Sequence, residues 1–205
     1  VKRSVLYITY TGVLEPLGLS QVLAYLEHLV QDRPVHILSF ERPSDLADSA
    51  RVRALQARID GAGINWHPYV YHRRPSVLGT AWDVVVGAWA GVRLARLHGL
   101  TVFHARSYVA SAIALFIRGW MGGRFLFDMR GFWADERVDG GLWPRGGLMY
   151  RIAKRFERRF LLEADHVVSL TQTGVDEMQR FDYLRARCPP MTVIPTCADL
   201  SRFVP

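Results

Sequence analysis

The sequence predicts an α/β fold with a doubly wound, Rossmann-like parallel sheet of about seven strands and helices on both faces. Short apolar runs alternate with longer amphipathic segments along all 205 residues. Most of the short runs are continuously apolar, which is typical of parallel strands that are buried on both faces. The sequence shows no internal repeat and no low-complexity segment, so these elements are expected to form one sheet with right-handed crossovers.

The first half of the chain is expected to supply three strands and three helices. Six apolar side chains at helical spacing give the first helix a buried face, and Ser20 is its candidate N-cap. Ser44 is the candidate N-cap of the second helix, because Asp45 then lies where the helix dipole favours a carboxylate. Pro68 indicates an edge strand or a bend, since proline offers no N–H to a neighbouring strand. The predicted strands are 5–9, 35–40 and 64–71, and the predicted helices are 19–31, 44–60 and 79–98.

The second half continues the same alternation. Thr171 or Thr173 is expected to cap the last helix. The long helix is strongly amphipathic, with five basic residues from Arg151 to Arg159 on one face. Such a helix can lie on an anionic membrane or can be a solvated helix docked on the sheet, and the sequence leaves both open. The predicted strands are 101–105, 124–129, 166–170 and 192–194, and the predicted helices are 108–120, 145–164 and 174–181.

Charge and composition limit the classes of partner. The net charge of +7 and the pI near 9.8 favour anionic partners such as phosphates, nucleic acid or an acidic lipid surface. Two cysteines, Cys188 and Cys197, make no disulfide framework and lie in no metal-ligand spacing, so neither a metal nor a cofactor is expected. The apolar stretch 84–92 is too short to span a bilayer, which needs about 20 residues. No signal peptide is recognised, so the expected location is cytoplasmic, with peripheral contact at the inner face of the membrane as an option.

Ligands of a doubly wound sheet bind outside the carboxyl ends of its strands, so the residues that follow each strand are the candidates. The loop after the first strand, 9–21, contains Gly12 and Gly18 and leads into a helix N-terminus, which favours anions. It matches neither the dinucleotide-binding fingerprint nor a P-loop. The loop is therefore either a place where phosphates approach the backbone or a plain connection whose glycines only turn the chain.

The segment after the fourth strand contributes a second candidate. Arg106 precedes Ser107, which is an expected helix cap, so the arginine could meet an anion there or could be a surface residue. His104 in the same segment is expected to be a core histidine that bonds to the backbone.

The segment 128–143 is the richest in functional groups. A loop of this length is usually functional or disordered, and its aromatic side chains argue against disorder. Aromatic faces bind sugar rings while a few charged groups fix orientation, so a functional loop is predicted here. The alternative is a lid whose charges pair among themselves, for example Arg130 with Asp135. The charged and aromatic residues of this segment include Asp128, Arg130, Asp135, Glu136, Phe132, Trp133 and Trp143.

Two segments resemble a known family. The last thirteen residues, VIPTCADLSRFVP (193–205), resemble the crossover segment of family 4 glycosyltransferases of the two-lobed GT-B fold, with Thr196 and Cys197 in place of the usual Asn-Gly. The segment DMRGFWADE (128–136) resembles a subgroup with an acidic-x-Arg-Gly-x-Trp stretch. Other members have a histidine there, which this chain lacks. The resemblance implies an N-terminal, acceptor-side domain over 1–195, with 196–205 beginning the linker to a C-terminal, donor-binding domain that is absent from this chain.

The resemblance also implies an activity. It implies a retaining, metal-independent transferase, of the hexosyl type, that moves a sugar from a nucleotide-sugar to a sugar or lipid-linked hydroxyl acceptor in polysaccharide or glycolipid synthesis. Gly12 and Gly18 would let phosphates approach, Arg130 would orient a phosphate or acceptor oxygen, and Asp128 or Asp135 would orient the acceptor hydroxyl or act as its base. This fragment alone is expected to be inactive. The further residues expected to bind acceptor or phosphate are Arg106, Trp133, Glu136 and Thr173.

Two alternatives stay open. A nucleotide-sugar epimerase lobe of the same two-lobed fold would share this architecture, and only a product assay with and without an acceptor would separate it. A non-catalytic basic module that binds an anion or a membrane is supported by the net charge and by the basic residues of 151–159. These residues form no recognised nucleic-acid motif, so nucleic acid is not an expected partner.

Overall fold

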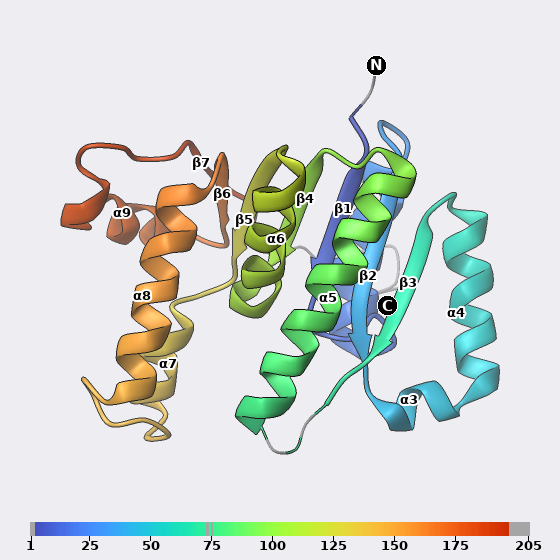
Figure 1. The fold of residues 1–205 in the computed structure, drawn as a ribbon, viewed down its shortest axis with the longest axis horizontal. Helices are drawn as coiled ribbons and strands as arrows, with labels where there is room; N and C mark the ends of the chain where they lie inside the picture. The colour runs from blue at the N-terminus through green and yellow to red at the C-terminus, as the bar shows by residue number, and fades with distance from the viewer. Residues whose placement is uncertain (1–2, 73, 75, 197–205) are drawn as a thin grey trace, which may run out of the picture.

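The computed structural model describes residues 3–72, 74 and 76–196. Seven strands form one sheet in the order β3-β2-β1-β4-β5-β6-β7, and every pairing is parallel (Figure 1). The predicted fold class is therefore confirmed, and β3 lies at an edge, as Pro68 indicated. The strands are β1 (Val5–Thr9), β2 (Val35–Glu41), β3 (Asn65–Val70), β4 (Val102–Arg106), β5 (Arg124–Met129), β6 (His166–Ser169) and β7 (Met191–Val193).

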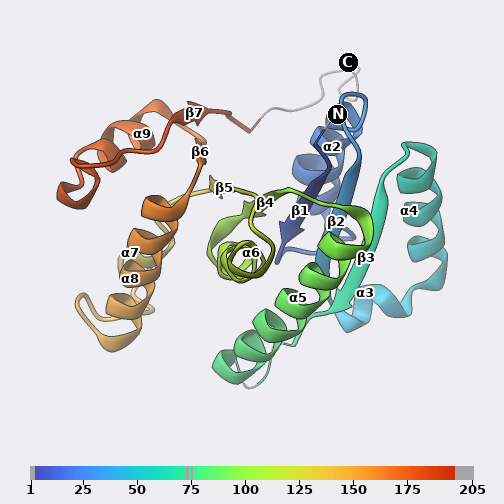
Figure 2. The same cartoon turned by 45° about the horizontal axis from the view of Figure 1, so that its top comes forward.

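Helices cover both faces of the sheet (Figures 1 and 2). α1 (Pro16–Gly18), the π-helical turn η1 (Leu19–Leu23) and α2 (Ala24–Leu29) run as one continuous segment. The others are α3 (Pro43–Ala47), α4 (Ser49–Gly61), α5 (Ser76–His98), α6 (Ser107–Met121), α7 (Trp133–Asp139), α8 (Leu148–Glu163), α9 (Gln172–Gln179) and the short 3-10 helix η2 (Asp182–Leu184). Apolar residues of α2 and α4 pack on one face, and those of α5, α6, α8 and α9 form a larger core on the other.

The chain reverses its direction across the sheet between β1 and β4. The first two crossovers run from β1 through β2 to β3, and the crossover through α5 then brings the chain to the far side of β1. In sheets of this kind, ligands bind in the crevice where the strand order reverses, outside the carboxyl ends of the strands. The carboxyl ends of β1 and β4 therefore mark the place where a binding site is expected.

Two helix starts differ from the sequence-based prediction, and each has a local cause. The first helical segment begins at Pro16 rather than near Ser20, because proline suits the first turn of a helix; the Ser20 hydroxyl instead donates to the Pro16 carbonyl at 2.9 Å. The predicted second helix is two helices, because the Asp48 side chain accepts a hydrogen bond from the Arg51 amide at 3.0 Å and caps α4. Ser44 therefore caps neither of them.

The segment 128–143 is not a plain loop, because it contains α7. Asp135 and Glu136 lie in the first turn of this helix, where the helix dipole stabilises carboxylates. After α7, Gly146 adopts a φ of +76°, and α8 begins only at Leu148, later than predicted.

The long helix α5 extends well beyond the apolar stretch 84–92 on both sides. By length and composition only, its Val77–His98 portion is apolar enough to cross a bilayer. In the fold it lies on the sheet, with Ala88 among its buried residues. Its buried Asp83 accepts hydrogen bonds from the Tyr10 hydroxyl at 2.8 Å and from the His72 amide at 3.0 Å. These bonds join the first half of α5 to the segments that follow β1 and β3.

Three histidines meet beside β2 and β3. His36 Nδ1 lies 3.2 Å from His67 Nε2, and the rings of His36 and His98 are 4.4 Å apart. Burial, together with the neighbouring His98 and His67, lowers the pKa of His36 to about 4. Burial and His98 also lower the pKa of His67. His36 and His67 therefore resist protonation in the folded chain.

Acid should weaken the fold through His36. Between its ordinary pKa of 6.5 and its folded value of about 4, the unfolded chain binds a proton that the folded chain does not, so stability falls as the pH falls. The free energy of unfolding should drop by up to about 3 kcal/mol across this window. Urea unfolding at neutral pH and at about pH 4 measures the drop, which His36→Gln should reduce. The exposed control His28→Gln should keep the wild-type drop, and an equal drop in both variants would contradict the prediction.

Candidate functional site

Polar side chains lie side by side at the carboxyl edge where the strand order reverses. Thr9 of β1 is in register with Arg106 of β4, and Arg106 is in register with Asp128 of β5. Arg106 is 9% exposed and Asp128 is 5% exposed. Buried charged groups are rare unless they are paired, so these residues need specific partners.

Gln21, in the π-helical turn η1, connects two arginines in this crevice. Its Oε1 accepts hydrogen bonds from Arg106 Nη2 at 2.7 Å and from Arg130 Nη2 at 3.1 Å. Arg130 Nη2 also donates to Thr196 Oγ1 at 3.1 Å, and Arg130 Nη1 lies 3.8 Å from Asp128 Oδ1. A neutral amide therefore holds two guanidinium groups close together without neutralising either of them.

Three buried polar atoms in the crevice have unused hydrogen-bonding capacity. Within the described part of the chain, Arg106 Nε, Asp128 Oδ1 and His104 Nε2 have no hydrogen-bond partner. His104 Nε2 lies 3.8 Å from Asp128 Oδ2, which is too far for a hydrogen bond. Burial lowers the pKa of Arg106, although a guanidinium remains protonated in proteins. Two guanidinium groups beside one carboxyl group suit a polar ligand that carries negative charge.

The backbone next to the crevice is irregular at two positions. Ser107, the first residue of α6, has a φ of +72°, a left-handed conformation that residues other than glycine rarely adopt. Arg106 holds the N-cap position of α6 without a side-chain cap bond, so Ser107 is not the cap that the sequence suggested. Gln21 lies in the π-helical turn on the other side of the crevice. Irregularities of both kinds concentrate at functional sites.

A cavity of about 500 Å³ lies next to the crevice and shares Arg130 with it. It opens between the turn after β5, α7, and the turn from β6 into α9. Carboxyl groups outnumber basic groups around it, and two phenylalanine rings give it an apolar wall. Such a mixture of rings and hydrogen-bonding groups suits a polyhydroxy ligand. Its charged and aromatic lining residues are Arg130, Phe132, Asp135, Glu136, Asp139, Lys154, Glu177 and Phe181.

Asp135 belongs to a network that joins α7 to α8. Its Oδ2 lies 3.0 Å from Lys154 Nζ, and its Oδ1 accepts a hydrogen bond from the Tyr150 hydroxyl at 2.9 Å. Lys154 Nζ also lies 2.5 Å from Oε1 of the buried Glu157, which accepts a second bond from the Tyr108 hydroxyl. Burial acts to lower the pKa of Lys154, but its bonds to Glu157 and Asp135 raise it overall. The Asp135 carboxylate is therefore already paired.

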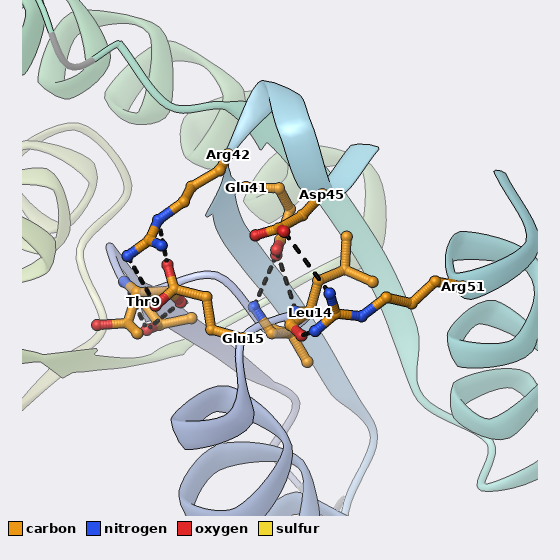
Figure 3. A network of polar contacts seen from close by, with 9 residues as sticks. Thr9, Leu14, Glu15, Glu41, Arg42, Asp45 and Arg51 are labelled. Atoms are coloured by element: carbon orange, nitrogen blue, oxygen red, sulfur yellow. Dashed lines mark hydrogen bonds and ion pairs between the residues drawn. The ribbon is translucent and has the colours of Figure 1, made fainter. Parts of the chain in front are cut away.

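The loop after β1 is bound from within by Glu41 of β2 (Figure 3). Glu41 is fully buried. Its Oε1 accepts hydrogen bonds from the Val13 amide at 2.8 Å and the Ser39 hydroxyl at 2.6 Å, and its Oε2 accepts one from the Leu14 amide at 3.1 Å. Burial raises the pKa of Glu41, and these hydrogen bonds oppose the rise. Two backbone amides of the loop are thus occupied by a carboxylate of the protein itself.

Both glycines of this loop are required by contacts inside the protein. A Cβ on Gly12 would lie 2.5 Å from Glu41 Oε2, and a Cβ on Gly18 would lie 2.1 Å from the Gly12 carbonyl oxygen. Arg42 closes the rim of the same loop through an ion pair with Glu15 at 3.0 Å (Figure 3). These contacts explain why glycine is needed at both positions even when no ligand is bound. The predicted role of Gly12 and Gly18 in the approach of phosphates stays a prediction.

The structure brings most of the predicted site residues together. Arg106, Asp128 and Arg130 form the crevice, and Asp135 and Glu136 line the adjoining cavity with Arg130. The alternative pairing of Arg130 with Asp135 is not formed, since Asp135 pairs with Lys154. Within the described residues, no group of three or more His, Cys, Asp or Glu side chains could hold a metal ion.

Two predicted residues lie elsewhere. Trp133 packs between Tyr108 and Trp143, with ring centroids 5.6 and 5.0 Å away, and it does not line the cavity. Thr173 is exposed in the first turn of α9, where Thr171 is the cap because its Oγ1 accepts a hydrogen bond from the Gly174 amide at 3.0 Å. The roles predicted for Trp133 and Thr173 remain predictions.

Sequence reasoning did not single out Gln21 or Glu41. Glu41 carried a usable signal, because an acid at the end of an otherwise apolar strand must find hydrogen-bond donors when it is buried. Gln21 carried none, since a glutamine beside the apolar stripe of an amphipathic helix is ordinary. Sequence reasoning also placed Lys154 on a basic face that was either solvated or bound to a membrane, whereas Lys154 lies between two carboxylates.

Comparison with protein families gives one match. The family described as Glycosyltransferase Family 4 matches residues 18–202. No curated protein matches the sequence significantly.

Solved structures share the fold at low sequence identity. UGT2 from Phytolacca americana, complexed with UDP-2fluoro-glucose and pterostilbene, matches with a TM-score of 0.64 at 10% identity over 95% of this chain and 54% of its own. UGT71G1 from Medicago truncatula, complexed with UDP-glucose, matches with a TM-score of 0.64 at 8% identity over 98% of this chain and 53% of its own. A proposed UDP-N-acetylglucosamine 2-epimerase from Listeria monocytogenes matches with a TM-score of 0.57 at 11% identity over 94% of this chain and 45% of its own. This chain thus spans about half the length of the proteins it matches.

Proposed function

Because this chain belongs to glycosyltransferase family 4 and has the architecture of one GT-B lobe, we propose that it is the acceptor-side lobe of a retaining glycosyltransferase. The enzyme would move a hexosyl group from a nucleotide-sugar to a hydroxyl acceptor, in polysaccharide or glycolipid synthesis. The observation that carries the proposal is the crevice in which Gln21 holds Arg106 and Arg130 together beside Asp128. It lies at the carboxyl edge of the sheet, where the strand order reverses.

The two guanidinium groups would stabilise the leaving diphosphate. In sugar transfer, the bond between the anomeric carbon and the diphosphate oxygen breaks, and negative charge collects on the phosphate oxygens. Arg106 and Arg130 are placed before the reaction starts, so they need little reorganisation to meet that charge. Arg106 Nε, which has no hydrogen-bond partner among the described residues, gives the crevice one further donor. Two similar structures contain UDP-glucose or a UDP-glucose analogue, which supports a nucleotide-sugar as the donor.

Asp128 is the better candidate of the two carboxylates to orient the acceptor hydroxyl. Its Oδ1 is buried without a hydrogen-bond partner among the described residues, so it can accept a bond from a hydroxyl group. Asp135 is instead bound to Lys154 and Tyr150, which fits a role in holding α7 in place. The acceptor proton would leave towards Asp128 or towards the departing diphosphate.

The cavity beside Arg130 is the proposed place for a sugar unit of the acceptor. Glu136, Asp139 and Glu177 can accept hydrogen bonds from sugar hydroxyls, and Phe132 and Phe181 offer apolar faces to a ring. Residues 1–195 would form this acceptor-side domain, and 196–205 would begin the linker to a donor-binding lobe. Apart from Thr196, the proposed linker start lies outside the described residues.

A product assay tests the proposal. Full-length protein should transfer sugar from one of a panel of UDP- and GDP-sugars to a saccharide or lipid-linked saccharide, and NMR of the product should show the retained anomeric configuration. An inverted product would contradict the retaining mechanism. Conversion of the nucleotide-sugar to its epimer without an acceptor would favour the epimerase alternative instead.

The lobe alone should not catalyse transfer. A polypeptide of residues 1–205 should give no measurable product under conditions in which the full-length protein turns over, because the donor is expected to bind mainly to the other lobe. Circular dichroism should first establish that the polypeptide is folded. Transfer by this polypeptide at the full-length rate would contradict the division of roles between lobes.

A further inference from the structure

We propose that the outer face of α5, α6 and α8 docks on the surface of an anionic lipid bilayer. These three helices lie next to one another on the side of the sheet opposite α2 and α4, with direct contacts from α5 to α6 and from α6 to α8 (Figures 1 and 2). This surface contains none of the crevice residues, and its binding to lipid does not depend on sugar transfer.

Three aromatic side chains form an exposed cluster between α5 and α6. Trp89 of α5 lies 5.9 Å from Phe116 and 5.6 Å from Trp120 of α6, measured between ring centroids. Trp89 is 52% exposed and Trp120 is 57% exposed, although aromatic side chains of this size usually bury most of their surface. Tryptophan concentrates at membrane–water interfaces, because its ring is apolar and its N–H is polar.

The cluster is part of a wider apolar surface. On α5, Leu78, Trp82, Val85 and Trp89 follow the spacing of a single helical stripe, and all four are exposed. The first half of α8 adds further exposed apolar side chains. They are Leu148, Met149, Ile152 and Phe156. Exposed apolar side chains that gather on neighbouring helices in this way are typical of an interaction site rather than a solvated face.

The charges on the same face select an anionic surface as the partner. α5 contains one acid, Asp83, which is buried, and α6 contains none. On α8, Glu157 is buried and Glu163 is paired with Arg118 at 3.2 Å. The exposed arginines on these helices that have no ion pair within the described residues are Arg93, Arg96, Arg151, Arg155, Arg158 and Arg159. Tryptophans with unpaired cations and no unpaired acid fit a bilayer rich in anionic headgroups better than a protein surface of mixed charge.

A groove on α5 brings aromatic, aliphatic and basic side chains together. It has a volume of about 470 Å³ and is lined by Trp89, Val92, Arg93, Arg96 and Leu97. Two guanidinium groups there could bind a lipid phosphate while the indole and the leucine contact acyl chains. The buried Asp83 binds Tyr10 and His72, so α5 would lie along the membrane surface as part of the domain rather than cross the bilayer.

This placement also orients the crevice. A helix that follows a parallel strand begins at the carboxyl edge of the sheet, so the exposed Leu78 and Trp82 of α5 lie near that edge. Leu148 and Met149 begin α8, which follows the α7 side of the cavity. The apolar surface therefore extends to the edge that bears the candidate site, and a lipid-linked acceptor would reach that site from the bilayer.

Vesicle co-sedimentation of the full-length protein tests the proposal. Wild type should bind vesicles of phosphatidylcholine mixed with phosphatidylglycerol more tightly than vesicles of phosphatidylcholine alone, and added salt should weaken the binding. The triple variant Trp82→Ser/Trp89→Ser/Trp120→Ser should weaken partitioning into the vesicles by about 100-fold, because the transfer of each indole out of water contributes favourably to the free energy of binding. Leu17→Ser/Val70→Ser changes exposed apolar side chains away from this face and should leave binding unchanged.

A charge-matched pair of variants separates a specific face from overall charge. Arg93→Gln/Arg96→Gln should weaken binding to the mixed vesicles by about 20-fold. Arg33→Gln/Arg53→Gln removes the same charge from exposed positions elsewhere on the domain, one of them on α4, and should have little effect. Bromine-labelled lipid should quench the tryptophan emission of both control variants and of wild type. It should not quench the emission of the triple tryptophan variant.

Four outcomes would overturn the proposal. They are the absence of binding to the mixed vesicles, wild-type binding by the folded triple tryptophan variant, equal losses in the two arginine pairs, and lipid-independent dimerisation that the tryptophan changes abolish. Circular dichroism checks that each variant is folded, and all of the changed side chains are exposed.

Discussion

Replacing Glu41 with alanine should lower the free energy of unfolding by about 3–5 kcal/mol, because it removes a fully buried carboxylate that three donors share. The Val13 and Leu14 amides and the Ser39 hydroxyl would lose their acceptor inside the protein. Ser39 Oγ also accepts a hydrogen bond from Trp66 Nε1 at 2.8 Å, so the disturbance should spread towards β3. Urea unfolding followed by tryptophan fluorescence and by circular dichroism measures the loss.

Two variants define the cause of this loss. Glu41→Gln keeps the shape and one acceptor oxygen but presents an NH₂ group to a donor, so its effect should fall between wild type and Glu41→Ala. Glu15→Ala removes a carboxylate from the same loop, where it pairs at the rim with the exposed Arg42, and should cost about 1 kcal/mol or less. A loss for Glu41→Ala no larger than that for Glu15→Ala would show that Glu41 does not hold the loop.

Replacing Arg130 with alanine should lower the turnover of the full-length enzyme at least about tenfold, because a preorganised guanidinium would be lost where charge develops. Arg130 joins the crevice to the cavity, through Gln21 on one side and the cavity wall on the other. Arg130→Lys keeps the charge but loses the planar fork, so its turnover should lie between those of wild type and Arg130→Ala. Steady-state kinetics with saturating donor and acceptor measure the change.

The matched control is Arg185→Ala. Arg185 is an exposed arginine just after the short helix η2, and its side chain pairs with the exposed Asp182 at 2.8 Å. Its removal should leave turnover close to wild type, since surface ion pairs of this kind contribute little. Turnover of Arg130→Ala near the wild-type value would remove Arg130 from the site, and equal losses in both variants would point to a general effect of charge.

The sheet could be predicted from the sequence because its strands are short, continuously apolar and separated by longer amphipathic segments. The strands over 5–9 and 124–129 were placed at their observed bounds. The segment DMRGFWADE and the crossover segment also indicated the right family. The crevice followed from a general rule about carboxyl ends rather than from any single residue, which is why Arg106, Asp128 and Arg130 were found together.

The local details could not be predicted, because they depend on contacts between segments far apart in the sequence. Gln21 lies near Arg130 only after the sheet brings η1 over the ends of β4 and β5. Trp133 looked like a sugar-binding residue because it follows a strand, but α7 turns it against Tyr108 and Trp143. Lys154 was assigned to a solvated or membrane-bound basic face because of its basic neighbours, but its two carboxylate partners come from α7 and from the next turn of its own helix.

The internal carboxylate of the β1 loop also affects binding entropy. A mobile loop must lose conformational freedom when a ligand arrives, and that loss subtracts from affinity. Here Glu41 already binds the Val13 and Leu14 amides. Gly12 lies against Glu41 and Gly18 lies against the backbone of the loop, so closely that neither position has room for a side chain. This loop, which leads through α1 into the π-helical turn that bears Gln21, is therefore held in place before a ligand arrives, so little affinity should be lost in ordering it.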